Sequence, residues 1–176
     1  MKNLFIFLTL TIIGCSCMAQ RVAVSKSVSL STQKKLRKAD KKEITSLVTN
    51  KLGKTEYLAR AITNNPDNVF LVDDLVVLVK SIPIPKNPKI LTELKLALDN
   101  SAEGLKNYSS KIENIAGREV YLVDQVTEGI KIYRFRTVNR SGDILVNGFI
   151  QYKPGDELKA RKALEDIIKG LKFDTE

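Results

Sequence analysis

The clearest alternation of apolar and polar residues lies in the last third of the chain. Residues 130–138 (IKIYRFRTV) and 144–152 (ILVNGFIQY) are rich in β-branched and aromatic residues, and a short loop containing Gly142 joins them. Two such runs joined by a short glycine-containing loop predict an antiparallel hairpin. Gly148, in the middle of the second run, indicates either a bulge or a close approach by a group packed against the strand.

Side chains of a strand point alternately to its two faces. One face of the first strand carries Ile130, Ile132, Arg134, Arg136 and Val138. Burying two arginines on this face costs free energy unless each guanidinium group has a partner. We therefore expect Arg134 and Arg136 to line an anion-accepting cleft or to lie at an exposed rim. The alternative is that they pair with Asp124 or Glu128 of the neighbouring strand.

A helix is predicted directly after this hairpin. Pro154 and Gly155 end the second strand, Asp156 is placed to cap the helix, and Gly170 is placed to end it. The apolar residues recur at helical spacing and form one stripe: Leu158, Ala163, Leu164, Ile167, Ile168 and Leu171. Two ion pairs are expected on its polar face, Glu157–Arg161 and Glu165–Lys169. A hairpin followed by a helix that packs across it predicts an α+β fold with an antiparallel sheet.

The middle of the chain contributes further elements. Residues 33–52, 53–68 and 90–107 have helical spacing. Residues 69–72 and 75–79 predict two short buried strands around a turn at Asp73 and Asp74. The proline-containing run 81–89 predicts an extended connector. Residues 118–126 predict a strand that forms a meander with the hairpin.

The first 19 residues are predicted to be a secretory signal peptide. Lys2 precedes an apolar run of ten residues, 4–13, which is too short to span a bilayer. Cleavage after Ala19 and lipidation of Cys15 within a lipobox-like sequence both fit this leader. Residues 20–32 are then a tether or an edge strand, and residues 33–176 form a single α+β domain.

The composition limits the possible chemistry. The chain has no histidine, and its two cysteines, Cys15 and Cys17, lie in the leader. This excludes Cys/His nucleophiles, Ser-His-Asp triads and His/Cys zinc sites in the body. We predict no catalytic residue, no cofactor and no metal site. The alternative is a hydrolase of envelope polymers that uses two carboxyl groups across a cleft, drawn from Asp73, Asp74, Asp124 and Glu128.

The formal net charge is +9, which favours anionic partners. A basic cluster occupies the first predicted helix: Lys34, Lys35, Arg37, Lys38, Lys41 and Lys42. It is either a solvated helix face or a contact with an anionic surface. Together with a lipid on Cys15 it would give the two signals needed for stable attachment to a membrane. Nucleic acid is not expected, because the chain carries an export signal and no aromatic residues lie between these lysines.

The order of elements resembles a known family. A helix, then a strand that opens at residues 117–121 (GREVY), a meander and a final helix ending LEDIIKGLKF (164–173) are similar to the PsbP-like α/β/α sandwich family, which includes exported bacterial proteins of the DcrB type. The resemblance implies helices on both faces of an antiparallel sheet and a non-catalytic accessory role. It carries over no functional residue.

These inferences together predict an exported, non-catalytic binding or accessory module of the cell envelope. Its partner would be an envelope protein or an anionic surface. The expected contact residues are Arg118, Tyr133, Arg134 and Arg136.

Overall fold

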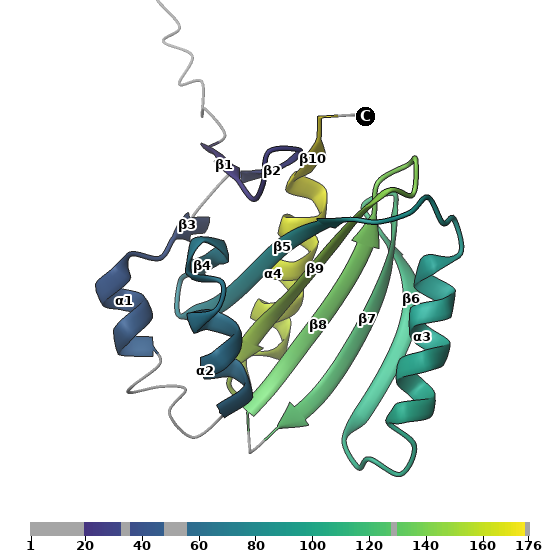
Figure 1. Cartoon of the computed structure of the whole chain (residues 1–176). Coiled ribbons are helices and arrows are strands. Elements are labelled where there is room, and N and C mark those ends of the chain that lie inside the picture. The colour runs from purple at the N-terminus through teal and green to yellow at the C-terminus, as the bar shows by residue number, and fades with distance from the viewer. Residues whose placement is uncertain (1–19, 33–35, 48–55, 128–129, 175–176) are drawn as a thin grey trace, which may run out of the picture.

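The computed structural model describes residues 20–32, 36–47, 56–127 and 130–174, and its centre is a seven-stranded sheet in which every described pairing is antiparallel (Figure 1). The strands are β3 (Leu36–Lys38), β4 (Val69–Val72), β5 (Leu75–Pro83), β6 (Tyr108–Ile115), β7 (Arg118–Thr127), β8 (Ile130–Val138) and β9 (Ile144–Tyr152). Their spatial order is β3-β4-β5-β9-β8-β7-β6. The predicted α+β class with an antiparallel sheet is confirmed.

Helices cover both faces of this sheet. One face packs against α4 (Glu157–Gly170), which buries Phe135 and Ile150 of the sheet. The opposite face carries α2 (Glu56–Thr63) above the β4–β5 side and α3 (Ile90–Ser101) above the β6–β7 side. Figure 1 shows α2 and α3 separated by the central strands. The middle of the sheet is therefore open on the face that carries α2 and α3.

A second, three-stranded sheet closes one end of α4. It has the order β1-β2-β10, formed by β1 (Gln20–Ala23), β2 (Val28–Thr32) and β10 (Leu171–Phe173). Residues 20–32 thus form strands. Strand β10 begins directly after α4, and a side chain at Gly170 would overlap the carbonyl oxygen of Ser31. Glycine at this position lets the end of α4 approach the backbone of β2.

The predicted hairpin and final helix are confirmed in their bounds, but the expected helix contacts are wrong. Asp156 occupies the cap position without a side-chain capping hydrogen bond. Glu157 pairs with Lys131 of β8, and Arg161 pairs with Glu113 of β6 as well as with Glu165. Because α4 lies across the strands, partners on β8 and β6 replace the expected Glu157–Arg161 pair. Within the helix, Glu165 pairs with Arg161 in place of Lys169.

The helix predicted over residues 33–52 is wrong in its first half. Leu36–Lys38 form β3, paired with β4, and only Lys41–Ser46 form α1 within this stretch. Asp40 starts that helix through a capping box with Glu43, in which each side chain accepts a hydrogen bond from the other residue's backbone N–H. Leu36 is buried at the sheet edge, and this burial overrides the helical spacing.

Strand β6 was not predicted. Residues 108–115 (YSSKIENI) pair with β7 at the edge of the sheet, where polar residues on the outer side weaken the alternation. Helix α3 therefore ends at Ser101, whereas the helix was predicted to extend to residue 107. Residues 66–68 form a short 3₁₀ helix, η2 (Pro66–Asn68), where a turn was predicted.

Gly148 marks a close approach and not a bulge. The ladder runs through it without interruption, opposite Val79 of β5 and Phe135 of β8. A Cβ atom at this position would overlap the ring of Phe135 and would lie 2.7 Å from the carbonyl oxygen of Leu78. The Phe135 ring occupies the space that any side chain at residue 148 would need. The second of the two sequence-based alternatives for Gly148 is confirmed.

We expect Gly148→Ala to lower the free energy of unfolding by about 1–3 kcal/mol, the usual cost of overpacking a core. Urea denaturation measures the change. Asn147→Ala is the matched control, because its side chain points to the open face, and it should stay within about 0.5 kcal/mol of the parent chain. A Gly148→Ala protein as stable as the control would contradict the close packing of Phe135.

Candidate functional site

The open face between α2 and α3 contains a hollow of about 250 Å³. Five polar side chains line it: Asn65, Lys80, Arg134, Arg136 and Asn147. Its apolar lining includes Ala61, Leu78, Ile82 and Phe149. We call this hollow the cationic pocket, because three of its side chains are basic and none of the described residues that line it is Asp or Glu.

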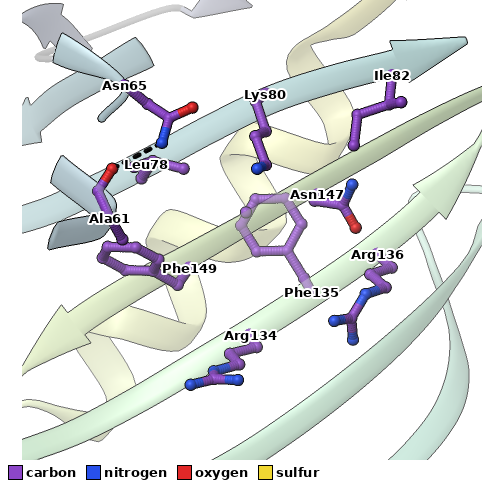
Figure 2. Close-up of a pocket in the computed structure, with 11 residues that line it drawn as sticks. Ala61, Asn65, Leu78, Lys80, Ile82, Arg134, Phe135, Arg136, Asn147 and Phe149 are labelled. Carbon is purple, nitrogen blue, oxygen red and sulfur yellow. Dashed lines mark hydrogen bonds between the residues drawn. The ribbon is translucent and has the colours of Figure 1, made fainter. Parts of the chain in front are cut away.

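The sheet register brings four of these polar residues together from three different strands. Lys80 of β5 lies opposite Asn147 of β9, and Asn147 lies opposite Arg136 of β8. Figure 2 shows Asn147 between Lys80 and Arg136. Side chains directly opposite one another are about 5 Å apart at Cβ, and Arg134 lies two residues, about 7 Å, along β8. Three cations therefore surround one amide side chain within a small area.

The neighbouring row of the sheet supplies the apolar part of the pocket. Leu78, Phe149 and Arg134 lie opposite one another on β5, β9 and β8. Figure 2 shows Phe149 beside Ala61 of α2, whose carbonyl oxygen accepts a hydrogen bond of 2.7 Å from Asn65. Leu78 and Phe149 thus give the cationic pocket an apolar surface beside α2, and Arg134 lies in the same cross-strand row.

Arg136 is oriented by an aromatic neighbour. Its guanidinium carbon lies 5.6 Å from the centre of the Tyr121 ring, a distance typical of a cation–π contact. Tyr121 is completely buried, and its hydroxyl lies 3.1 Å from that of Tyr108. Tyr121 therefore gives Arg136 a rigid surface on the side of the pocket that faces α3.

A carboxylate of α3 holds these tyrosines in place. Asp99 accepts hydrogen bonds from Tyr108 (2.7 Å) and Ser110 (2.5 Å) and forms an ion pair with Lys95. The bond from Lys95, followed by those from Ser110 and Tyr108, lowers the pKa of Asp99 from 3.8 to about 2. Burial, with the bonds to Tyr121 and Asp99, raises the pKa of Tyr108. Asp99 is thus ionised and Tyr108 is neutral at physiological pH.

The structure separates the four predicted contact residues into two pairs. Arg134 and Arg136 lie together in the cationic pocket, as expected. Tyr133 and Arg118 point to the opposite face, so they do not share a site with the two arginines. The Tyr133 ring packs on Tyr152 with centroids 4.8 Å apart, and Arg118 lies 4.9 Å from the centre of the Phe173 ring. Adjacent strand positions alternate between faces, so closeness in sequence did not indicate a shared site.

The carboxylate partner expected for the arginines is also on the other face. Asp124 lies opposite Tyr133 in the ladder and accepts a hydrogen bond of 3.2 Å from the Tyr152 hydroxyl. Its side chain therefore points away from the cationic pocket. Glu128, the other expected partner, lies outside the described residues.

Asp73 and Asp74, the other carboxylates of the hydrolase alternative, have structural roles. Asp73 takes a φ of 55° in the β4–β5 turn, as turn chemistry predicted, and Asp74 pairs with Lys159 of α4. That pairing lowers the pKa of Asp74. Across the ranges that the structure describes, no three His, Cys, Asp or Glu residues form a group that could hold a metal ion.

The described residues of the predicted basic helix face lie on two elements, a strand and a helix. Arg37 and Lys38 belong to β3, where Arg37 pairs with Glu43 and Lys38 pairs with Asp67 at 3.2 Å. Lys41 and Lys42 are exposed on the first turn of α1. Lys34, Lys35 and Cys15 lie outside the described residues. In the part of the chain that is described, no helix combines the length and apolar character needed to cross a bilayer.

Comparison with known proteins bears on the fold alone. No protein-family model and no curated protein matches the chain. A crystal structure from Bacteroides thetaiotaomicron VPI-5482 is similar with a TM-score of 0.53 and 11% identity, over 89% of this chain and 48% of that one, so this chain spans about half its length. The solution structure of cyanobacterial PsbP (CyanoP) from Synechocystis sp. PCC 6803 is similar with a TM-score of 0.45 and 13% identity, over 91% of this chain and 95% of that one. At 11% identity, the first of these similarities concerns the fold alone.

The depressed pKa of Asp99 predicts an acid-sensitive contribution to stability. Its folded value of about 2 lies below its ordinary value of 3.8, so the contribution is present above about pH 4 and is lost as the pH falls towards 2. Thermal melts of the parent chain and Asp99→Asn between pH 2 and 5 measure it. The stability difference between the two proteins should shrink as the pH falls. Asp67→Asn, which removes an exposed carboxylate, is the control, and a difference that stays constant for Asp99→Asn would contradict the assignment.

Proposed function

We propose that the protein is a non-catalytic binding or accessory module of the cell envelope that holds an anionic group of its ligand or partner in the cationic pocket. The proposal depends on one observation: β5 and β8, which are not adjacent, bring Lys80, Arg134 and Arg136 around one hollow. A concave site lined by charges of one sign concentrates the electrostatic field and attracts the opposite charge.

The chemistry of the pocket favours holding a ligand over transforming it. Arginine stays protonated at any physiological pH, so Arg134 and Arg136 cannot accept a proton as general bases. Asn147 does not titrate. The guanidinium groups instead present fixed arrays of N–H donors that match carboxylate and phosphate oxygens. These groups select and orient an anion, which is the role of a binding module.

The cell-envelope setting is supported by the leader. Residues 1–19 have the basic start, the short apolar core and the small-residue end of a secretory signal. A body without thiol or imidazole groups suits a compartment in which free thiols would be oxidised. Under this proposal the protein acts outside the cytoplasm, where it meets soluble anions, acidic proteins or the anionic surface of a membrane.

Replacing Lys80, Arg134 and Arg136 together by Gln should weaken the binding of small organic anions by at least about tenfold, because the charged hydrogen bonds are lost. The matched control is Lys162/Lys169/Lys172→Gln, which removes the same charge from exposed positions on α4 and β10. Isothermal titration calorimetry of both variants, at equal ionic strength, makes the comparison. Equal losses of affinity in the two variants would show that only the net charge matters, and would reject the cationic pocket as the binding site.

The mass of the mature protein tests the export part of the proposal. We expect a chain that begins at Gln20, or one that begins at a lipid-modified Cys15, when the gene product is isolated from its producing cell. Intact-protein mass spectrometry distinguishes the two. A chain that keeps all 19 leader residues and stays inside the cell would contradict the proposed location.

A further inference from the structure

Strand β6 forms one edge of the seven-stranded sheet. Among the described strands it pairs only with β7, so the other side of its backbone faces no strand of the described chain. The turn that joins the two strands fixes which backbone groups lie on that side. Ala116 (φ 52°) and Gly117 (φ 83°) form a two-residue loop in the left-handed region, and the two residues that flank such a loop exchange hydrogen bonds.

The alternation of an antiparallel ladder then assigns every residue of β6. Ile115 and Arg118 flank the loop and lie opposite one another. At the far end of the ladder the Val126 N–H donates to the carbonyl oxygen of Asn107, which has the same phase. Odd-numbered residues therefore bond to β7, and the even-numbered residues from 108 to 114 direct their N–H and C=O groups to the outer edge. Such a row of groups is a template for pairing with another strand.

The charges of β6 match those of a second copy of the same strand. Lys111 and Glu113 lie on the α4 face of the sheet, where Glu113 also pairs with Arg161 of α4. An antiparallel pair centred on Ile112 places Lys111 of each copy opposite Glu113 of the other. Opposite charges directly across a ladder are favourable, and like charges are unfavourable. Centring the pair on residue 111 or residue 113 would place like charges opposite one another, so the charge pattern selects the register centred on Ile112.

Helix α3 adds an apolar group at the same edge. Asp99 accepts hydrogen bonds from Tyr108 and Ser110, so this side of α3 faces β6. Leu96 lies three residues earlier, on the same side of the helix. Because α3 and β6 run in opposite directions (Figure 1), Leu96 is level with the middle of β6. Leu96 is 65% exposed, so it is available to a molecule that pairs with this edge.

The dimensions of the sheet would bring two copies of α3 into contact. Helix α3 packs above β6 and β7, and neighbouring strands lie about 4.8 Å apart. Across a pair of β6 strands the two α3 axes would therefore be about 10 Å apart, which is a usual distance between packed helices. Leu96 of one copy would then meet Leu96 of the other, above the two Ile112 side chains.

From these features we infer that the protein forms a two-fold symmetric dimer through the edge of β6. Residues 109–115 of the two copies pair in antiparallel fashion about Ile112, and Leu96 packs on its counterpart beside the axis. The two seven-stranded sheets become one continuous sheet with both α3 helices on the same face. The interface uses no residue that lines the cationic pocket, so dimerisation and anion binding are tested separately.

Sedimentation equilibrium of the mature chain measures the dimer, and we expect a dissociation constant below about 100 μM. Leu96→Gln removes the apolar contact and keeps a good helix former. Lys111→Glu places a glutamate opposite Glu113 of the second copy. Each variant should raise the dissociation constant at least about tenfold.

The matched controls make the same substitutions on the outer face of α4. They are Leu158→Gln, at a leucine that is 86% exposed, and Lys162→Glu, at an exposed lysine. Both controls should dimerise as the parent chain does. Thermal melts of all four variants show that each protein is folded.

Every other outcome would overturn the inference. A mature chain that stays monomeric at about 1 mM has no such interface. A dimer that Leu96→Gln and Lys111→Glu leave unchanged uses another surface. Weakening by only one of the two would contradict the arrangement, because both contacts lie beside the same two-fold axis. Equal weakening by the controls would show an association that depends on net charge or on exposed leucines in general.

Discussion

The unbroken antiparallel pairing of β8 with β9 and β7 is the constraint on which the rest of the molecule depends. It places Phe135 on the α4 face and Arg134 and Arg136 on the other. A register shift of one residue would exchange these faces and bury two guanidinium groups under α4. Gly148 opposes such a shift, because only a residue without a side chain fits above the Phe135 ring. One packing contact thereby supports both the core and the position of the cationic pocket.

The two faces of the sheet differ in how completely helices cover them. On the α4 face the strands bury large apolar side chains that form one cluster with those of α4 and β2. On the opposite face the cover is split between α2 and α3, and the polar side chains of three strands fill the gap. A single helix laid across the middle of that face would have buried the charged side chains of Lys80, Arg134 and Arg136, and taking charges out of water is costly. The split cover leaves these side chains partly exposed.

Some elements were predictable because their sequence pattern and their tertiary packing favour the same structure. The hairpin 130–152 has a clean period of two, and α4 has a continuous apolar stripe with proline and glycine at its ends, so local pattern and tertiary packing agree. Residues 36–38 were misassigned because the helical spacing of a few leucines and isoleucines outweighed the capping signal at Asp40. Strand β6 was missed because an edge strand has a solvated side and a weak alternation.

Only part of the cationic pocket could be predicted from the sequence. Arg134 and Arg136 stand two residues apart on one strand, so alternation alone brings them together. Lys80 and Asn147 are more than 50 residues from each other, and only the β5–β9 ladder makes them neighbours. The available signal was a polar interruption of two apolar runs, Lys80–Ser81 in VVLVKSI and Asn147 in ILVNGFI. Such an interruption marks a position that leaves the core, but it does not identify its cross-strand neighbours.

The small sheet has a consequence for the order in which the molecule is completed. Strand β2, near the N-terminus, pairs with β10, which ends at Phe173, and Arg21 bonds to Asp174. A chain that emerges from the ribosome or from a translocation channel with its N-terminus first presents β2 long before its partner exists. Strand β2 thus stays without its β10 partner until residues 171–173 have emerged. The closing of this small sheet is the step that joins residues 20–32 to residues 171–173.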